Sequence, residues 1–243
     1  MNIALIGYGK MGKTIEQLAL DRGWSVPIKL DIGIPLPENS QRKTVDAAIH
    51  FATAKTLVED LTPWAESGVP VVIGTTGWND KLADIQHLAQ EYNIGVVHAA
   101  NFSLGVNVFF RIAKEASKMM NKFADYDVSI HEVHHKEKID SPSGTALQLG
   151  KIVLTEIDRK KELLTAPPDG KIKPEQLHVS SSRTGWVIGE HSLEFDSIAD
   201  AIEIKHTAKN RNGLALGALV AAEWVQHKHG IFTMDDVLED LFT

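Results

Sequence analysis

Short apolar runs and stretches with helical spacing alternate along the first hundred residues of the chain. The apolar runs are rich in Val, Ile and Ala, which is typical of strands buried in a parallel sheet. They lie at 2–6, 25–31, 45–52, 69–77 and 94–101. Segments with helical spacing separate most of them, at 11–19, 55–68 and 81–92. Strand–helix–strand units of this kind predict a Rossmann-type, doubly wound parallel sheet.

The pattern changes after Asn101. Residues 104–123 have the spacing of a long amphipathic helix, whereas 127–133 is rich in β-branched residues. Strand-like runs then follow one another from 176 to 208 with almost no helix between them, which favours an antiparallel or mixed sheet in a second, α+β domain. The expected division is a first domain at 1–103, a second at 104–210, and a C-terminal helix at 211–243 that packs back on the first.

Composition and charge narrow the class of protein. With 43% hydrophobic and 23% charged residues, the 243-residue chain is that of an ordinary globular protein. A net charge of −7 argues against a nucleic-acid or anionic-membrane partner, because both require clustered Lys and Arg. The absence of cysteine excludes disulfides and thiol catalysis. The N-terminal sequence lacks the features of a secretory signal, so we expect a soluble, cytoplasmic protein.

A glycine-rich motif follows the first apolar run. Gly7, Gly9 and Gly12 spell G-x-G-x-x-G between a predicted strand and a predicted helix. The first glycine permits a tight turn, the second a close approach to a pyrophosphate, and the third close packing of helix on strand. The motif therefore predicts a nicotinamide-dinucleotide site. The predicted cofactor loop comprises Gly7, Tyr8, Gly9, Lys10, Met11 and Gly12.

Further cofactor contacts are expected where later strands end. Asp31 ends the second predicted strand, where an acid usually binds the adenosine ribose and would repel a 2′-phosphate. Arg42 or Lys43 could reach back to such a phosphate, which leaves the choice between NADH and NADPH open. Ligands of open α/β sheets collect beyond the carboxyl ends of the strands. Two loops there are predicted to contact the cofactor: Gly74, Thr75 and Thr76, and Ala99, Ala100, Asn101 and Phe102.

The stretch HEVHH at 131–135 also satisfies H-E-x-x-H, the zinc signature of a metalloprotease helix. The residues around it predict a strand, in which positions i and i+4 lie about 13 Å apart and cannot share one ion. We therefore expect no metal site here, and a Glu132→Gln change to have comparatively little effect.

The residues that follow predict an anion site instead. Ser143 has the position of a helix N-cap, and Gly144 and Thr145 open the helix with free N–H groups. His134, His135 and Lys138 lie just upstream and add further donors. Such a pocket suits a small substrate with two carboxylates.

These residues resemble a known family, the 4-hydroxy-tetrahydrodipicolinate reductases (dihydrodipicolinate reductases) of the diaminopimelate and lysine pathway. The resemblance spans essentially the whole chain, and its most specific part is HHKEKIDSPSGTA at 134–146. Its other parts are GYGKMG at 7–12, GTTG at 74–77, AANFSLGVNV at 99–108, GEHSLEF at 189–195 and IEIKHTAKNRNGLALGAL at 202–219.

The resemblance implies a role for each residue of the pocket. His134 takes the family's acid/base position, Lys138 is the proton donor, and His135 contacts the substrate. Gly144 and Thr145 hold a substrate carboxylate at the helix start that Ser143 caps.

The resemblance also implies the wider function. It implies reduction of a cyclic dicarboxylate with NADH or NADPH, by a first domain that binds the dinucleotide and a second that binds substrate and forms a homotetramer. The alternative is another two-domain NAD(P)-dependent amino-acid dehydrogenase.

Overall fold

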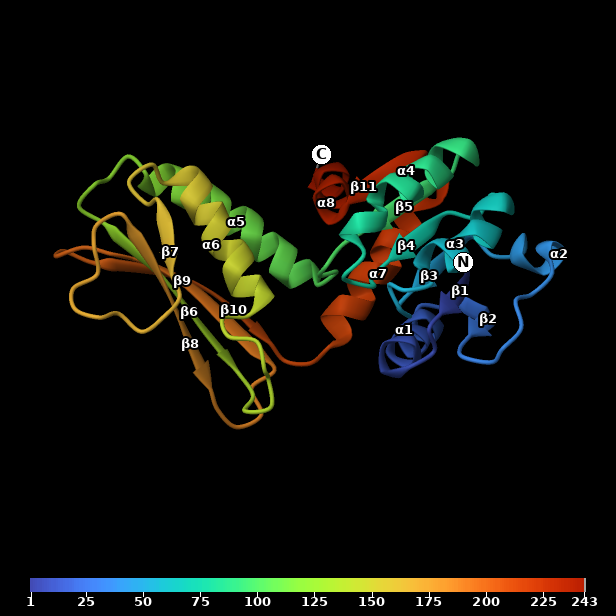
Figure 1. The fold of residues 1–243 in the computed structure, drawn as a ribbon, viewed down its shortest axis with the longest axis horizontal. Coiled ribbons are helices and arrows are strands. Elements are labelled where there is room, and N and C mark those ends of the chain that lie inside the picture. Colours follow the sequence, from blue (N-terminus) through green and yellow to red (C-terminus); the bar gives the residue numbers. More distant parts are fainter. Residues whose placement is uncertain (243) are drawn as a thin grey trace. The chain divides into compact units, whose positions relative to one another are not determined.

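The computed structural model describes residues 1–242 and divides into two compact units. Unit 1 comprises Met1–Leu104 together with the segment that begins at Asn212, and unit 2 comprises Gly105–Arg211 (Figure 1). Unit 2 is therefore a continuous segment, whereas unit 1 is built from both ends of the chain.

Unit 1 contains a six-stranded sheet in the described part of the chain, in the order β11-β5-β4-β3-β1-β2. Every neighbouring pair of strands is parallel. The strands are β1 (Asn2–Ile6), β2 (Ser25–Leu30), β3 (Ala47–His50), β4 (Val71–Ile73), β5 (Gly95–His98) and β11 (Gly230–Thr233). The parallel sheet expected from the alternating pattern is confirmed.

Helices cover both faces of this sheet because alternate strand residues point to opposite sides. Ile3 and Leu5 of β1 belong to one core, which α1 (Lys10–Asp21), α7 (Asn212–Trp224) and α8 (Met234–Phe242) complete. Ala4 and Ile6 belong to the other, against α3 (Leu57–Glu66) and α4 (Leu82–Glu91). The remaining short helices are α2 (Asn39–Arg42), η1 (Asn79–Lys81) and η2 (Val225–His227).

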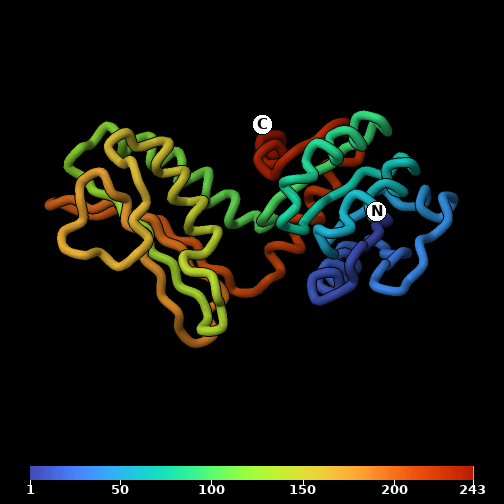
Figure 2. Tube along the Cα trace, viewed as in Figure 1, coloured from blue at the N-terminus to red at the C-terminus, as the bar shows by residue number. Residues whose placement is uncertain are grey.

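The C-terminal segment differs from the single helix expected over 211–243. It forms α7, then η2, the edge strand β11 and finally α8. Gly230 has φ 111°, a backbone conformation that interrupts a helix, and the Ile-Phe-Thr that follows has the side chains of a strand. In Figure 2 the red C-terminal trace lies among the elements of unit 1, as the contacts of Leu219 and Val237 in its core also show.

Unit 2 contains a mixed five-stranded sheet in the order β10-β9-β6-β8-β7. β6 runs parallel to β8 and antiparallel to β9. The strands are β6 (Asp127–His134), β7 (Glu162–Leu164), β8 (Gln176–Arg183), β9 (Gly189–Asp196) and β10 (Ala201–Ala208). Helices α5 (Leu104–Met120) and α6 (Gly144–Glu156) pack on one face around a core that includes Phe109, Leu149 and Phe195. The second sheet is thus mixed, as the sequence predicted.

Within residues 1–242 no helix combines the length and the apolar composition needed to cross a bilayer.

Candidate active site

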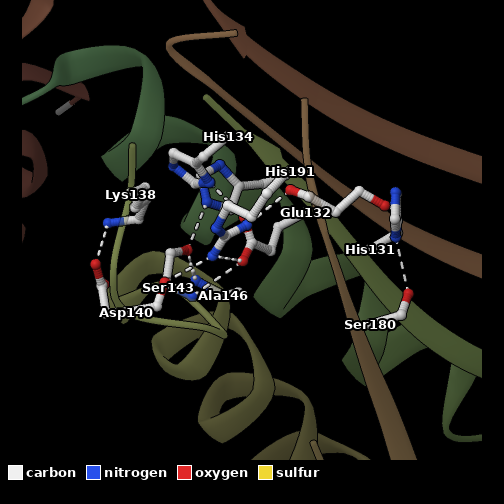
Figure 3. Close-up of polar contacts among 11 residues, drawn as sticks. His131, Glu132, His134, Lys138, Asp140, Ser143, Ala146, Ser180 and His191 are labelled. Atoms are coloured by element: carbon white, nitrogen blue, oxygen red, sulfur yellow. Dashed lines mark hydrogen bonds and ion pairs between the residues drawn. The ribbon is translucent and has the colours of Figure 1, made fainter. Parts of the chain in front are cut away.

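The side chains of β6 alternate between the two faces of the sheet of unit 2. Glu132 and His134 are buried on the helix-covered side, whereas His131 is exposed and its Nδ1 lies 2.8 Å from Ser180 Oγ. His131 and Glu132 therefore point to opposite faces, as Figure 3 shows. The strand predicted for this stretch is confirmed, and it rules out a helical H-E-x-x-H geometry.

The carboxylate of Glu132 is fully buried and fully hydrogen-bonded. One oxygen, Oε2, contacts Nδ1 of His134. The other, Oε1, accepts a bond from the backbone N–H of Ser143 at 3.1 Å and from Nη2 of Arg183 at 2.8 Å. A buried carboxylate is stable only when it is paired in this way. Strand β6 is thereby connected to the end of β8 and to the start of α6.

These contacts set the charges of the site. Burial acts to raise the pKa of Glu132, but the hydrogen bonds from Arg183 and His134 outweigh it and lower the pKa to about 2. Burial lowers the pKa of His134, and the attraction of Glu132 only partly opposes this. At neutral pH Glu132 is therefore a carboxylate beside a neutral imidazole. Because the carboxylate can only accept, the proton of that imidazole lies on Nδ1.

A second buried histidine, His191 of β9, completes the cluster. Its ring meets that of His134 edge to face at 5.1 Å between centroids, and its Nε2 lies 3.0 Å from Ser143 Oγ. Burial, followed by repulsion from His134 once that ring is protonated, lowers its pKa to about 4, so it too is neutral at pH 7. The Nδ1 atom of His191 is buried and has no hydrogen-bond partner in the structure.

Gly189 leaves the space that His134 occupies. A Cβ atom at Gly189 would lie 2.9 Å from Nε2 of His134, closer than such atoms approach in proteins. Any larger residue at this position would therefore force the buried imidazole to shift.

Ser143 caps α6 as the sequence predicted. Its Oγ accepts the backbone N–H of Ala146 at 3.2 Å, and α6 begins at Gly144. A Cβ atom at Gly144 would meet no atom within 4 Å, so the helix start has open space beside it. Thr145 is half-buried in the same turn. The cap and the helix start required for an anion cradle are both present.

Lys138 lies in the loop between β6 and α6, and its Nζ contacts Asp140 Oδ1 at 2.7 Å (Figure 3). Its charge is one of the cations that lower the pKa of His134, which places it near the imidazole. His135 follows β6 and is half-buried. Arg183 holds the same loop, because its Nη2 also donates to the carbonyl of Asp140 at 2.6 Å.

Glu132, His134 and His191 are close enough to share a metal ion, with ligand atoms within 4.8 Å of one another. However, Oε1 of Glu132 is already bound by Arg183, whose positive charge would oppose a metal cation. That no metal binds here stays a prediction.

The glycine loop of unit 1 has the geometry that its motif requires. Gly7 has φ 91°, in the region that glycine favours. A Cβ atom at Gly12 would lie 2.5 Å from the carbonyl oxygen of Gly7, so the third glycine permits α1 to pack on β1. Gly9 precedes α1 without a side-chain cap, and a Cβ there would meet nothing within 4 Å. The N–H groups of the helix start are therefore open to an anion.

Tyr8, Lys10 and Met11 lie around this turn in different ways. The hydroxyl of Tyr8 contacts Glu16, Lys10 is exposed at the helix start, and Met11 packs on the core of unit 1. These contacts leave Lys10 as the exposed cation of the predicted cofactor loop.

A pocket of about 450 Å³ opens beside the second cofactor loop, lined by residues 51–54 and 74–76. Gly74 is needed because a Cβ there would overlap the ring of Phe51. Thr75 is buried, with Oγ1 2.8 Å from Nδ1 of the buried His50, and Thr76 is exposed. The carboxyl ends of β3 and β4, where ligands of such sheets bind, thus form an open pocket.

The third predicted loop is only partly available to a ligand. Ala99 and Asn101 are half-buried and Ala100 is exposed, but the Phe102 side chain is 1% exposed in the core of unit 1. Any contact of Phe102 with a cofactor would therefore come from its backbone. Asp31 is exposed just after β2.

Sequence reasoning missed three members of the cluster in unit 2. Glu132 was considered only as part of a zinc motif, and Arg183 and His191 were not singled out. The signals were the polar residues at inward positions of otherwise apolar strands, and the GEH within GEHSLEF. A buried polar residue on a strand requires a partner, which the sequence alone does not identify.

Two family models match the chain. One is described as dihydrodipicolinate reductase, N-terminus, and matches residues 27–102; the other is described as dihydrodipicolinate reductase, C-terminus, and matches 105–238. A 4-hydroxy-tetrahydrodipicolinate reductase of Christiangramia forsetii is 42% identical over 100% of this chain and 99% of its own length. One of Archaeoglobus fulgidus is 34% identical over 98% and 100%.

Solved structures share the fold. A dipicolinate-bound dihydrodipicolinate reductase from Paenisporosarcina sp. TG-14 superposes with a TM-score of 0.76 and 22% identity, over 96% of this chain and 97% of that one. An amine dehydrogenase from Mycobacterium smegmatis reaches 0.59 with 12% identity, over 97% and 95%. The two family models and the full-length relatives show that the chain belongs to the 4-hydroxy-tetrahydrodipicolinate reductase family, whose members are NAD(P)H-dependent oxidoreductases of lysine biosynthesis.

Proposed function

We propose that this chain reduces 4-hydroxy-tetrahydrodipicolinate to tetrahydrodipicolinate, with loss of water, by means of the cluster at the start of α6. The observation that carries the proposal is the joint placement of His134, Lys138 and the capped helix start in unit 2. The dipicolinate named for the fold relative is also a cyclic dicarboxylate.

The start of α6 would hold a carboxylate of the substrate. The N–H groups of Gly144 and Thr145 lie in the first turn, where the helix dipole favours an anion, and the hydroxyl of Thr145 adds a donor. His135 lies at the other end of the same loop and would provide a further substrate contact.

Lys138 is the proposed proton donor. The hydroxyl group leaves the substrate as water, which gives a conjugated C=C–C=N ring. NAD(P)H, when bound, supplies the hydride that adds to this ring. Negative charge then develops on the conjugated system of the substrate, and an ammonium group within reach neutralises it by giving up a proton. Asp140 holds that ammonium at 2.7 Å, which limits the positions it samples. His134 remains neutral beside it and takes the acid/base position.

The glycine loop fits a dinucleotide. The unblocked helix start at Gly9 would hold the pyrophosphate, and the pocket beside Gly74, Thr75 and Thr76 would hold the nicotinamide half. These placements follow from the open space in unit 1 and from the family's use of NAD(P)H.

We propose that NADH is preferred over NADPH. Asp31 is exposed where a 2′-phosphate would lie and would repel it. Arg42, one of the two cations that could offset that repulsion, is buried, donating from Nε to Ser67 Oγ at 2.8 Å and from Nη1 to the carbonyl of Pro37 at 2.5 Å. Lys43 alone remains exposed. A lower kcat/KM for NADH than for NADPH would contradict this preference.

The homotetramer implied by the family resemblance is proposed as well. Strand β10 is mostly exposed, and Ile202 on it is 45% exposed, so this edge of the sheet of unit 2 offers surface to another copy. Light scattering of the purified protein at micromolar concentration tests the mass, and a stable monomer would exclude the proposal.

One assay tests the reaction and its proton donor. NAD(P)H oxidation is followed with the freshly generated product of dihydrodipicolinate synthase, for the wild type and for Lys138→Ala. We expect a loss of turnover of roughly 10²-fold or more in the variant, with cofactor affinity little changed. Lys136→Ala is the matched control, because this exposed lysine lies in the same loop and should retain turnover.

Two outcomes of this assay would count against the proposal. Undiminished turnover in Lys138→Ala would exclude Lys138 as the donor. A wild type inactive with both cofactors, yet active on an amino acid, would favour a related amino-acid dehydrogenase instead.

A further inference from the structure

The carboxylate of Glu132 connects three segments that are separate in the sequence. It contacts the imidazole of His134 on β6, the backbone N–H of Ser143 before α6, and the guanidinium of Arg183 at the end of β8. It is 0% exposed, so solvent does not compete for these contacts. The sequence did not predict that the side chain at position 132 would connect three segments.

We infer that Glu132 is a positioning residue for the proposed reaction, one that fixes the proton of His134 on Nδ1 and holds the loop of Lys138 and the start of α6 in place. The inference rests on the proposed function for its kinetic consequence, but not for the protonation state. Glu132 itself, being fully buried, does not contact the substrate.

The protonation state follows from the charges that face His134. These are the carboxylate of Glu132, the cations of Lys138 and Arg183, and the neutral ring of His191. Burial and the two cations oppose a second proton on the imidazole. The carboxylate accepts a hydrogen bond from Nδ1, so the single proton of the ring lies on that nitrogen. Nε2 is therefore left unprotonated.

The second role follows from the bonds to the other oxygen. Oε1 orients Arg183, and Arg183 Nη2 also binds the carbonyl of Asp140, whose carboxylate holds Lys138. The same oxygen accepts the N–H of Ser143, the residue that caps α6. The imidazole, the ammonium and the anion cradle are thus tied to one carboxylate.

These contacts replace the expectation that Glu132→Gln has little effect. A glutamine has nearly the same size and its amide oxygen can still accept the bonds from Ser143 and Arg183. Its amide nitrogen would then face His134 and can only donate, so Nδ1 of His134 must accept and the proton must move to Nε2. The variant therefore changes the tautomer while preserving most of the structure.

The tautomer is measured on the full-length protein at pH 7.5 with ¹⁵N-labelled histidine, since the two ring nitrogens of a neutral imidazole have distinct chemical shifts. The signals of His134 are assigned by their loss in a His134→Gln variant. We expect the Nδ1–H tautomer in the wild type and the Nε2–H tautomer in Glu132→Gln.

The kinetic comparison uses three variants. We expect kcat to fall at least about 10-fold in Glu132→Gln, with the dissociation constant for the cofactor unchanged. Glu132→Asp keeps the acceptor charge on a shorter side chain, so it should retain the wild-type tautomer and recover part of the lost kcat. Glu190→Gln is the matched control, because Glu190 lies next to His191 on β9 but its side chain points to the other face of the sheet, where it is paired with Lys205 at 2.6 Å.

Several results would overturn the inference. A wild-type His134 that is protonated on Nε2, or on both nitrogens, excludes the proposed role, whether or not any variant folds. An unchanged tautomer in a folded Glu132→Gln variant does so too, and so does an unchanged kcat. A wild type without reductase activity would count against the proposed function alone, because the tautomers do not depend on turnover.

Discussion

Each unit contains a buried histidine beside a carboxylate, and the two pairs differ in how the carboxylate is held. In unit 1, Nε2 of His50 lies 3.2 Å from Oδ2 of Asp60, whose side chain is 31% exposed. In unit 2, His134 contacts Glu132, which is fully buried and also bound by Arg183. Burial lowers the pKa of both histidines. A neutral imidazole is therefore common to both sites.

The difference between the pairs lies in what each imidazole can do. The carboxylate of Asp60 is partly exposed, so water screens part of its attraction for His50. The other nitrogen of His50 contacts Thr75 of the second cofactor loop. His50 thus acts by holding a loop. The buried carboxylate of Glu132 has no such screening and determines which nitrogen of His134 is protonated. Both histidines are buried, so the burial of the carboxylate distinguishes the pair that holds a loop from the pair that sets the protonation of its imidazole.

Replacing each histidine by glutamine is the sharpest test of this comparison, and His134→Gln should have the larger effect. We expect kcat to fall roughly 10²-fold or more, because the acid/base group is lost, while the cofactor still binds to unit 1. Steady-state kinetics and a fluorescence titration with the cofactor separate the two quantities. Retention of most of the turnover would remove His134 from the acid/base position.

The acid sensitivity of unit 2 provides the second test. The pKa of His191 is about 4 in the folded protein and about 6.5 when unfolded, so the unfolded chain binds the proton first. The stability that this group contributes is complete above pH 6.5 and is lost as the pH falls toward 4. Glu132, with a folded pKa of about 2, adds a loss between about 4.5 and 2.

Urea unfolding at a series of pH values measures this sensitivity. Between pH 7 and 4 we expect His191→Gln to reduce the loss of unfolding free energy by about 3 kcal/mol relative to the wild type. A His191→Gln protein with the same pH dependence as the wild type would show that the histidine is not held neutral in the fold.

His50→Gln should have the smallest effect. The loss of its contact with Thr75 removes one buried hydrogen bond, worth about 1 kcal/mol, and loosens the second cofactor loop. We expect the dissociation constant for the cofactor to rise about 5-fold, with kcat within about 2-fold of the wild type. A fall in kcat as large as that of His134→Gln would abolish the distinction between the two pairs.

Much of the fold could be predicted from the sequence because its signals are local. The predicted first strand coincides with β1, and α5 begins at the expected residue, because apolar periodicity and the glycine loop mark them clearly. The shorter elements α2, β7 and β11 were missed. Strands β3, β4 and β5 are equally short but lie within longer apolar runs, whereas β7 and β11 do not, and β11 exists only because β5 offers it an edge.

The features of the candidate site were likewise predictable only where they depend on residues close in sequence. The cap at Ser143 and the turn at Gly7 depend on residues close in sequence, and both were predicted. The bonds of Glu132 to Arg183 and of Ser143 to His191 span 51 and 48 residues, and only the pairing of β6 with β8 and β9 brings them together. The buried position of Arg42 likewise depends on Ser67, which lies 25 residues away.

The edge strand β11 affects the order in which the chain can fold during synthesis. Unit 2 is one continuous segment, and its sheet can close once residue 208 has left the ribosome. Unit 1 lacks one wall of its core until α7 supplies Ala218 and Leu219, and its sheet lacks an edge strand until Thr233 has been made. The first hundred residues are synthesised first, but one apolar face of their sheet therefore stays uncovered until the C-terminal segment has been made. We expect this early segment, rather than unit 2, to be the part of a nascent chain that chaperones bind.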